Sequence, residues 1–193
     1  MKYSNLKHNR NGFFDGPFIF EPRIFRDVRG VFFESWNKNR FEEKLGHKID
    51  FIQDNVSVSS KGVLRGIHYQ IVNKSQGKLV RCSKGSLLDV IVDLRKNSNT
   101  FKYWGSVNLS ASNNLQLWIP SGFGHAFLSL ENETMLEYKV TNYWSKEHER
   151  TLIWNDKTIN ISWPNINVQY NLSSKDLNGL TLEELNISNS LFI

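Results

Sequence analysis

Residues 86–94, with the sequence SLLDVIVDL, repeat with a period of two, which is the period of a β-strand. Leu88 and Val90 fall on one face of such a strand, whereas Asp89 and Ile91 fall on the other. An amphipathic helix would instead repeat its apolar residues every three or four positions. The run therefore predicts a strand that has apolar residues on both of its faces.

Similar short runs follow one another through most of the chain, with Gly, Asn, Ser and Lys between them and no alternating helices. We expect strands at 18–25, 30–36, 51–59, 63–70, 78–83, 86–94, 103–110, 114–119, 123–129 and 134–143. We expect short helices at 40–45, between an N-cap at Asn37 and Gly46, and at 181–185. The pattern predicts an all-β fold, an antiparallel sandwich or barrel with a few peripheral helices.

The length and composition indicate one domain. The chain has 193 residues, of which 39% are hydrophobic and 22% charged, values that exclude wholesale disorder. This length is too short for two domains of ordinary size. We therefore expect a single domain over 1–193, with its core at about 18–165 and a C-terminal wrap at about 166–193.

The charge and the single cysteine narrow the class of protein further. The formal net charge is +5, which suits an anionic small ligand but is too scattered to predict nucleic-acid binding. Cys82 stands alone in an apolar alternation, so it is expected to be a buried structural thiol. Since we find neither a signal-peptide pattern nor an apolar run long enough to span a membrane, we expect a cytoplasmic protein.

Two histidines stand in glycine-flanked strand ends. The segment GVLRGIH ends at His68, and PSGFGH ends at His125. Both segments resemble the two signature motifs of the cupin superfamily, which implies a cupin-type antiparallel β-barrel, or jelly roll. Metal-binding cupins of this kind carry His-x-His followed by a glutamate, but here the third position is Gln70. Because a transition-metal site needs at least three His or carboxylate ligands, we predict a barrel without metal.

A more specific resemblance extends over about 18–185. It rests on QDN at 53–55, VLRGIHYQ at 63–70, QGKLV at 76–80, LWIP at 117–120, YK at 138–139, WND at 154–156 and LSSKD at 172–176. Together these motifs resemble the dTDP-4-dehydrorhamnose 3,5-epimerases. The resemblance implies a cofactor-independent isomerase that inverts C3 and C5 of a dTDP-4-keto-6-deoxyhexose through an enolate. It also implies a homodimer in which an N-terminal strand pairs with the partner's sheet.

The same resemblance assigns roles to individual residues. His68 would be the base, Tyr138 the opposing acid, Asp176 the group that orients His68, and Lys78 the cation that stabilises the enolate. The residues that it implies for binding the nucleotide sugar are Arg29, Glu34, Gln53, Asp54, Asn55, Arg65, His125, Trp144, Glu149 and Lys175.

Strand geometry bears on two of these residues. Lys78 shares a strand face with Val80 and Cys82, so it is expected to point inward. Arg65 and His68 would fall on opposite faces of an ideal strand. Both reach one pocket only if Gly66 marks a β-bulge, which is a usual role for a glycine within a strand.

One departure from the family pattern concerns the substrate. Many family members carry tyrosine at the position of Trp144, and in the family this position lies near the sugar. This leaves open a 3-epimerase that spares C5, or an epimerase of another nucleotide-linked 4-keto sugar. A non-catalytic nucleotide-sugar-binding cupin and a metal-dependent cupin oxygenase are the alternatives from other functional classes.

Overall fold

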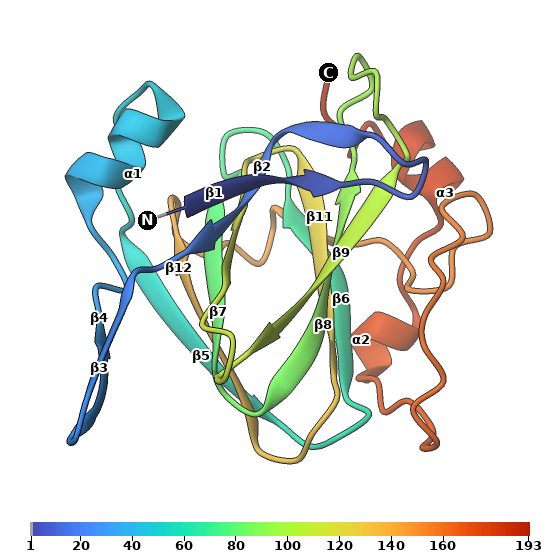
Figure 1. Ribbon diagram of the computed structural model, residues 1–193. Coiled ribbons are helices and arrows are strands. Elements are labelled where there is room, and N and C mark those ends of the chain that lie inside the picture. Colours follow the sequence, from blue (N-terminus) through green and yellow to red (C-terminus); the bar gives the residue numbers. More distant parts are fainter. Residues whose placement is uncertain (1) are drawn as a thin grey trace.

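The computed structural model describes residues 2–193 and consists of two antiparallel β-sheets packed face to face (Figure 1). The six-stranded sheet has the order β1 (Lys2–Lys7), β2 (Phe13–Glu21), β10 (Gln116–Ile119), β7 (Lys78–Lys84), β12 (Thr134–Val140) and β5 (Gln53–Ser59). The five-stranded sheet has the order β13 (Glu149–Thr151), β6 (Leu64–Gln70), β11 (Phe123–Ser129), β8 (Ser86–Asp93) and β9 (Trp104–Ser110). The predicted all-β antiparallel architecture is confirmed.

The core lies between the two sheets, because each strand sends every second side chain inward. Leu87 and Ile91 of β8 meet Val80 and Cys82 of β7 there, and all four are buried. Burial raises the pKa of the Cys82 thiol to about 11, so this cysteine stays protonated and has a structural role. The predicted strand at 86–94 is confirmed, with β8 ending at Asp93.

The N-terminal third differs from the expected pattern. The predicted strand at 18–25 is interrupted after Glu21, because Pro22 has no backbone N–H to continue the ladder. The chain then forms a separate hairpin of β3 (Ile24–Asp27) and β4 (Gly30–Phe33), which projects from the barrel beside α1 (Figure 1). Strand β1 was not predicted. Only Leu6 of this edge strand is buried, which makes its alternation weak.

Within residues 2–193, three helices lie outside the barrel. Helix α1 (Lys38–Leu45) begins at the N-cap Asn37, whose side chain accepts a hydrogen bond from the Arg40 N–H, and it ends at Gly46 in the left-handed conformation, as predicted. Helices α2 (Ser174–Leu177) and α3 (Leu182–Ile187) belong to the C-terminal segment. No helix within 2–193 is both long and apolar enough to cross a membrane.

The C-terminal segment covers the outer face of the five-stranded sheet. Leu185 and Phe192 pack there against Ile67 of β6 and Val92 of β8. Before these contacts in the chain, two parallel bridges, Val63 to Asn171 and Leu152 to Leu180, hold the residues on either side of α2. The segment that contains Asp176 is therefore fixed at both ends against the barrel.

A bulge in β6 confirms the role expected for Gly66. In the pairing with β11, His68 faces His125 and Arg65 faces Phe127, so two residues of β6 lie opposite one residue of β11. A Cβ atom on Gly66 would lie 2.5 Å from the Cβ of Ala126 and 2.6 Å from the carbonyl oxygen of His125. Only glycine permits this close approach, and the bulge turns Arg65 and His68 to the same side.

We predict that Gly66→Ala lowers the free energy of unfolding by about 3 kcal/mol, because the added methyl overpacks the β6–β11 contact and the φ of +121° disfavours any side chain. Gly46→Ala is the matched control, since its φ is also positive but nothing lies within 4 Å of the added Cβ. The control should lose about 1 kcal/mol. Urea denaturation measures both variants, and equal losses would show that the close approach at Gly66 is unimportant.

Candidate active site

A cavity of about 420 Å³ opens between the two sheets and collects most of the predicted site residues. Strands β5, β7 and β12 line it from one sheet, and β6 and β11 line it from the other. The predicted residues that line it are Gln53, Asn55, Arg65, His68, Lys78, His125, Tyr138, Trp144, Glu149 and Lys175. The structure thus brings together ten of the fourteen residues that the sequence selects, from segments far apart in the chain.

His68 and Asp176 form a closely coupled pair. The Nε2 atom of His68 lies 2.5 Å from Oδ1 of Asp176, and the Asp176 side chain is almost fully buried. Burial lowers the pKa of His68, and the hydrogen bond to Asp176 offsets part of this effect. At neutral pH the imidazole is therefore uncharged, and with Nε2–H donating to the carboxylate its Nδ1 can accept a proton.

The carboxylate of Asp176 is held in the charged form. Burial alone would raise its pKa, but hydrogen bonds from His68 and Ser173 outweigh burial and lower the pKa below the ordinary value. The Ser173 hydroxyl donates to Oδ2 at 2.7 Å and also caps α2 by accepting from the Asp176 N–H. Each carboxylate oxygen thus has its own partner, which keeps Oδ1 directed at His68.

A second histidine is paired in the same way. The Nε2 atom of His125 lies 2.9 Å from Oδ2 of Asp89, and both residues are buried. Asp89 shares a face of β8 with Leu87 and Ile91, and the structure shows that this face points inward, but Asp89 was not selected as a site residue. Because its partner is remote in the sequence, only the pairing of β8 with β11 reveals this interaction.

Lys78 is an unusual lysine because it points into the cavity and is 8% exposed. The prediction that it shares the inward face of Val80 and Cys82 is confirmed. Burial lowers its pKa to about 8, although the negative charges of Asp89 and Glu149 oppose this effect. The side chain is therefore mainly an ammonium ion at pH 7, and it faces the cavity with little competing solvation.

Tyr138 projects into the cavity from β12, on the sheet opposite to that of His68. Burial raises the pKa of its hydroxyl, and the nearby guanidinium of Arg65 opposes this shift only in part. The phenol is therefore protonated at neutral pH. A proton acceptor and a proton donor thus reach the same space from two facing sheets.

The entrance of the cavity is polar and carries positive charge. Arg65 is steadied by the hydroxyl of Ser59 at 3.3 Å, and the amide of Gln53 donates to Asn55 at 2.8 Å. Lys175 forms an ion pair with Glu149 at 3.1 Å, which joins α2 to β13 beside the cavity. These groups can bind the charged end of an anionic ligand, because arginine, lysine and amide N–H groups all donate to phosphate oxygens.

Three predicted ligand-binding residues lie away from this cavity. Arg29 is in the β3–β4 turn, exposed and paired with Asp27. Glu34 follows β4 and pairs with Arg40 at 3.2 Å. Asp54 points to the outer face of β5 and pairs with Lys139 at 2.9 Å. In a single chain these residues do not meet the groups around His68.

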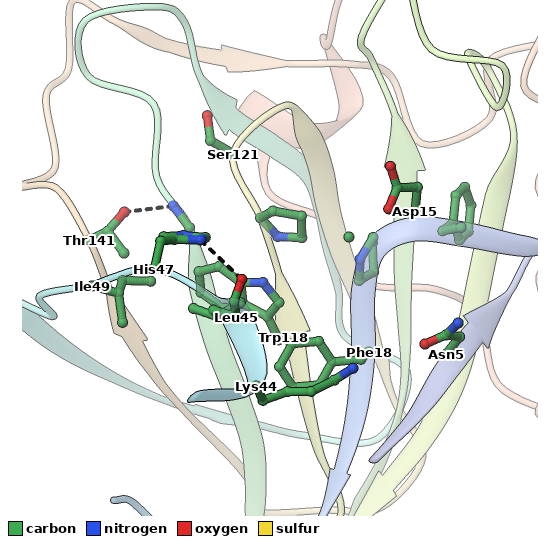
Figure 2. A pocket seen from close by; sticks show the side chains of 15 residues that line it. Asn5, Asp15, Phe18, Lys44, Leu45, His47, Ile49, Trp118, Ser121 and Thr141 are labelled. Carbon is green, nitrogen blue, oxygen red and sulfur yellow. Dashed lines mark hydrogen bonds between the residues drawn. The ribbon is translucent and has the colours of Figure 1, made fainter. Parts of the chain in front are cut away.

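Several cavity residues were not predicted. Ser57 and Phe127 line the cavity, as do Gln70 and Gln76. The alternation of β5 would have found Ser57, which shares the inward face with Gln53 and Asn55. A separate hollow of about 690 Å³, between α1 and strands β2 and β10, is lined by other residues (Figure 2).

Comparison with known proteins shows the family of this chain. Residues 13–184 match the sequence model of the family described as dTDP-4-dehydrorhamnose 3,5-epimerase. The chain belongs to this epimerase family. It is therefore an isomerase, and the predicted cupin-type β-barrel is confirmed.

Individual members show how close the similarity is. A dTDP-4-dehydrorhamnose 3,5-epimerase of Shigella flexneri is 55% identical over 161 residues, which cover 83% of this chain and 88% of that protein. The solved structure of an epimerase of Mycobacterium tuberculosis has a TM-score of 0.93 at 34% identity, covering 100% of this chain and 94% of that one. An epimerase of Legionella pneumophila, solved with dTDP-4-keto-L-rhamnose, has a TM-score of 0.90 at 40% identity, covering 99% and 98%.

A metal-dependent cupin oxygenase is one of the alternatives that the sequence leaves open. Across 2–193 the structure has no group of three or more His, Cys, Asp or Glu side chains placed to hold a metal ion. Gln70, which stands at the position of the missing ligand, directs its amide to backbone groups at Lys74, Tyr143 and Ser145.

We predict that Asp176→Asn lowers the pKa of His68 further, because the substitution removes the carboxylate charge that favours the imidazolium. An NMR titration of the His68 ring measures this shift directly. Asp54→Asn is the control, since Asp54 lies on the outer face of β5 and its loss should leave the titration unchanged. An unchanged or raised pKa in Asp176→Asn would contradict the proposed coupling.

Proposed function

We propose that this epimerase inverts C3 and C5 of dTDP-4-dehydro-6-deoxyglucose to form dTDP-4-dehydrorhamnose. The observation that carries this proposal is the cavity itself, which a histidine–aspartate pair and a tyrosine line from opposite sheets, together with a buried lysine. A flat enolate held between the sheets would present one face to His68 and the other to Tyr138.

The chemistry follows from the C4 ketone, which acidifies the hydrogens on the adjacent C3 and C5. His68 takes one of these protons, and the electron pair of the broken C–H bond moves onto the ketone oxygen. The Lys78 ammonium stabilises the resulting negative charge, and the low polarity of its surroundings strengthens the interaction. Asp176 stabilises the imidazolium that forms on His68.

Inversion is completed on the opposite face of the ring. The phenol of Tyr138 donates a proton to the same carbon, the enolate returns to the ketone, and the configuration is reversed. His68 then releases its proton to solvent and Tyr138 regains one. A proton is removed and a proton is returned without net oxidation, so the reaction needs no redox cofactor, and the Lys78 ammonium provides the positive charge for the enolate oxygen.

The nucleotide end of the substrate fits the polar entrance. Arg65 and Lys175 would bind the diphosphate, with Gln53 and Asn55 as hydrogen-bonding partners. His125, held by Asp89, would contact the sugar deeper in the cavity. In this proposal the charged diphosphate would lie at the entrance and the hexose between His68 and Tyr138.

We further propose a homodimer in which the β3–β4 hairpin crosses to the partner. Phe32 and Val28 at this hairpin are 71% and 105% exposed, which is costly for a protein that functions as a monomer. Val56 and Val58 on the outer face of the edge strand β5 are also exposed and offer an apolar surface to a second copy. Such an exchange would carry Arg29 and Glu34 to the partner's cavity.

The first prediction from this proposal concerns exchange with solvent. In heavy water the wild-type protein should incorporate deuterium into dTDP-4-dehydro-6-deoxyglucose at both C3 and C5, measured by mass spectrometry and NMR. His68→Ala and Tyr138→Phe should each lower the exchange rate by at least ~100-fold, the usual effect of losing a catalytic base or acid. His47→Ala, a histidine of the hollow in Figure 2, should exchange at the wild-type rate.

The label pattern separates the alternatives. Label at C3 alone would establish a 3-epimerase, and no label with tight binding of the nucleotide sugar would indicate another 4-keto sugar or a binding protein. Wild-type rates in both His68→Ala and Tyr138→Phe would contradict the acid–base mechanism.

The second prediction concerns the dimer. Sedimentation should give a mass of twice the 22.5 kDa of one chain. After subunit exchange, a mixture of His68→Ala and Arg29→Ala proteins should be more active than either alone, because an Arg29→Ala protomer with intact His68 receives Arg29 from its partner. A monomer, or a mixture no more active than the average of the two, would contradict the exchange of the hairpin.

A further inference from the structure

Three glutamines converge on one loop at the edge of the cavity. The loop is 142–145, which follows β12 and contains Trp144. Gln53 begins β5, Gln70 ends β6, and Gln76 precedes β7, so each glutamine comes from a different part of the barrel. All three line the cavity together with Trp144.

Their side-chain amides hold the backbone of four consecutive residues. Gln76 donates to the Asn142 carbonyl at 2.7 Å, and Gln53 accepts from the Trp144 N–H at 3.1 Å. Gln70 makes two such bonds, donating to the Tyr143 carbonyl at 3.1 Å and accepting from the Ser145 N–H at 2.6 Å. We call this arrangement the glutamine clamp.

The residue before the loop is also fixed. The Thr141 hydroxyl accepts from the Gly77 N–H at 2.8 Å (Figure 2). The Thr141 N–H donates to the Gly77 carbonyl at 3.1 Å. Beyond β12 the loop has no strand partner, so side chains must satisfy its peptide groups. Glutamine suits this role because its amide both donates and accepts.

The glutamine clamp and the Trp144 side chain that it supports differ in their exposure to solvent. Gln70 is 3% exposed, whereas Trp144 is 56% exposed and borders the cavity. A rigid backbone thus presents a large apolar surface next to an open site. Covering an exposed indole with a ligand removes apolar surface from water, which is favourable. Its flat face can pack on the C–H face of a sugar ring.

We propose that Gln70 and Gln76 are positioning residues that fix the peptide groups around Trp144, so that its indole covers the hexose in the cavity. This inference rests on the proposed function, which places the hexose between His68 and Tyr138. Retention of the hexose matters for that function, because two carbons must each lose and regain a proton before release. Gln53 belongs to the clamp but is also a predicted substrate ligand, so it is not used as a test.

The test compares two ligands by calorimetry. One is dTDP-rhamnose, which has no ketone and does not react, and the other is dTDP, which has no hexose. Gln70→Met keeps the length of the side chain but removes both hydrogen bonds to the loop. It should weaken dTDP-rhamnose binding about fivefold, the effect of about one hydrogen bond, and leave dTDP binding unchanged.

Two further variants control for loss of stability. Gln116→Met is the matched control, because Gln116 is 2% exposed and donates to the carbonyl of Ser35, away from the cavity. It should leave the affinity for both ligands unchanged. Gln76→Met removes a single hydrogen bond from a partly buried loop residue, and it should show the same selective loss even if Gln70→Met folds poorly.

A double mutant decides whether the clamp acts through Trp144. Trp144→Ala should weaken dTDP-rhamnose binding selectively, and adding Gln76→Met to it should have no further effect. A further loss in the double mutant, or an equal loss for dTDP in the single mutants, would overturn the proposal. Failure of the wild-type protein to bind either ligand would instead contradict the proposed function.

Discussion

The hydrogen bond between His68 and Asp176 is the interaction on which the site depends. It joins residues 108 positions apart, one in β6 and the other in the C-terminal segment. A carboxylate with 2% exposure is tolerated only when charged or polar partners satisfy it, and here His68 and Ser173 do so. Docking of the C-terminal segment therefore supplies the carboxylate partner of His68, the residue that we propose as the base, and the bridges at Val63 and Leu152 hold this segment against the barrel.

The two-sheet architecture supplies what an epimerisation requires. A planar intermediate must be reached from both of its faces. The two facing sheets hold a proton donor and a proton acceptor on opposite sides of the cavity, so neither sheet has to move. The close contact of β6 with β11 at Gly66 is part of this geometry, because the bulge brings Arg65 to the side of His68. Lys78 lies beside them, where burial makes its charge effective.

Polar side chains also determine how the loops around the cavity are held. Gln70 stands where metal-binding relatives of this barrel place a ligand, and its amide instead ties down the loop that carries Trp144. A buried amide that satisfies backbone groups of a loop stabilises one conformation of that loop.

The sequence by itself determined most of the strands between 51 and 140, the capped helix after Asn37 and the inward direction of Lys78, because each follows from local periodicity or backbone chemistry. The bulge at Gly66 was expected only if Arg65 and His68 share one pocket, and the pairing of β6 with β11 shows it. Edge strand β1 escaped prediction, since with only Leu6 buried it has almost no pattern. The tertiary structure alone decided which distant polar groups meet. Such pairings depend on how strands are ordered and loops are packed, and no local pattern in the sequence records that order.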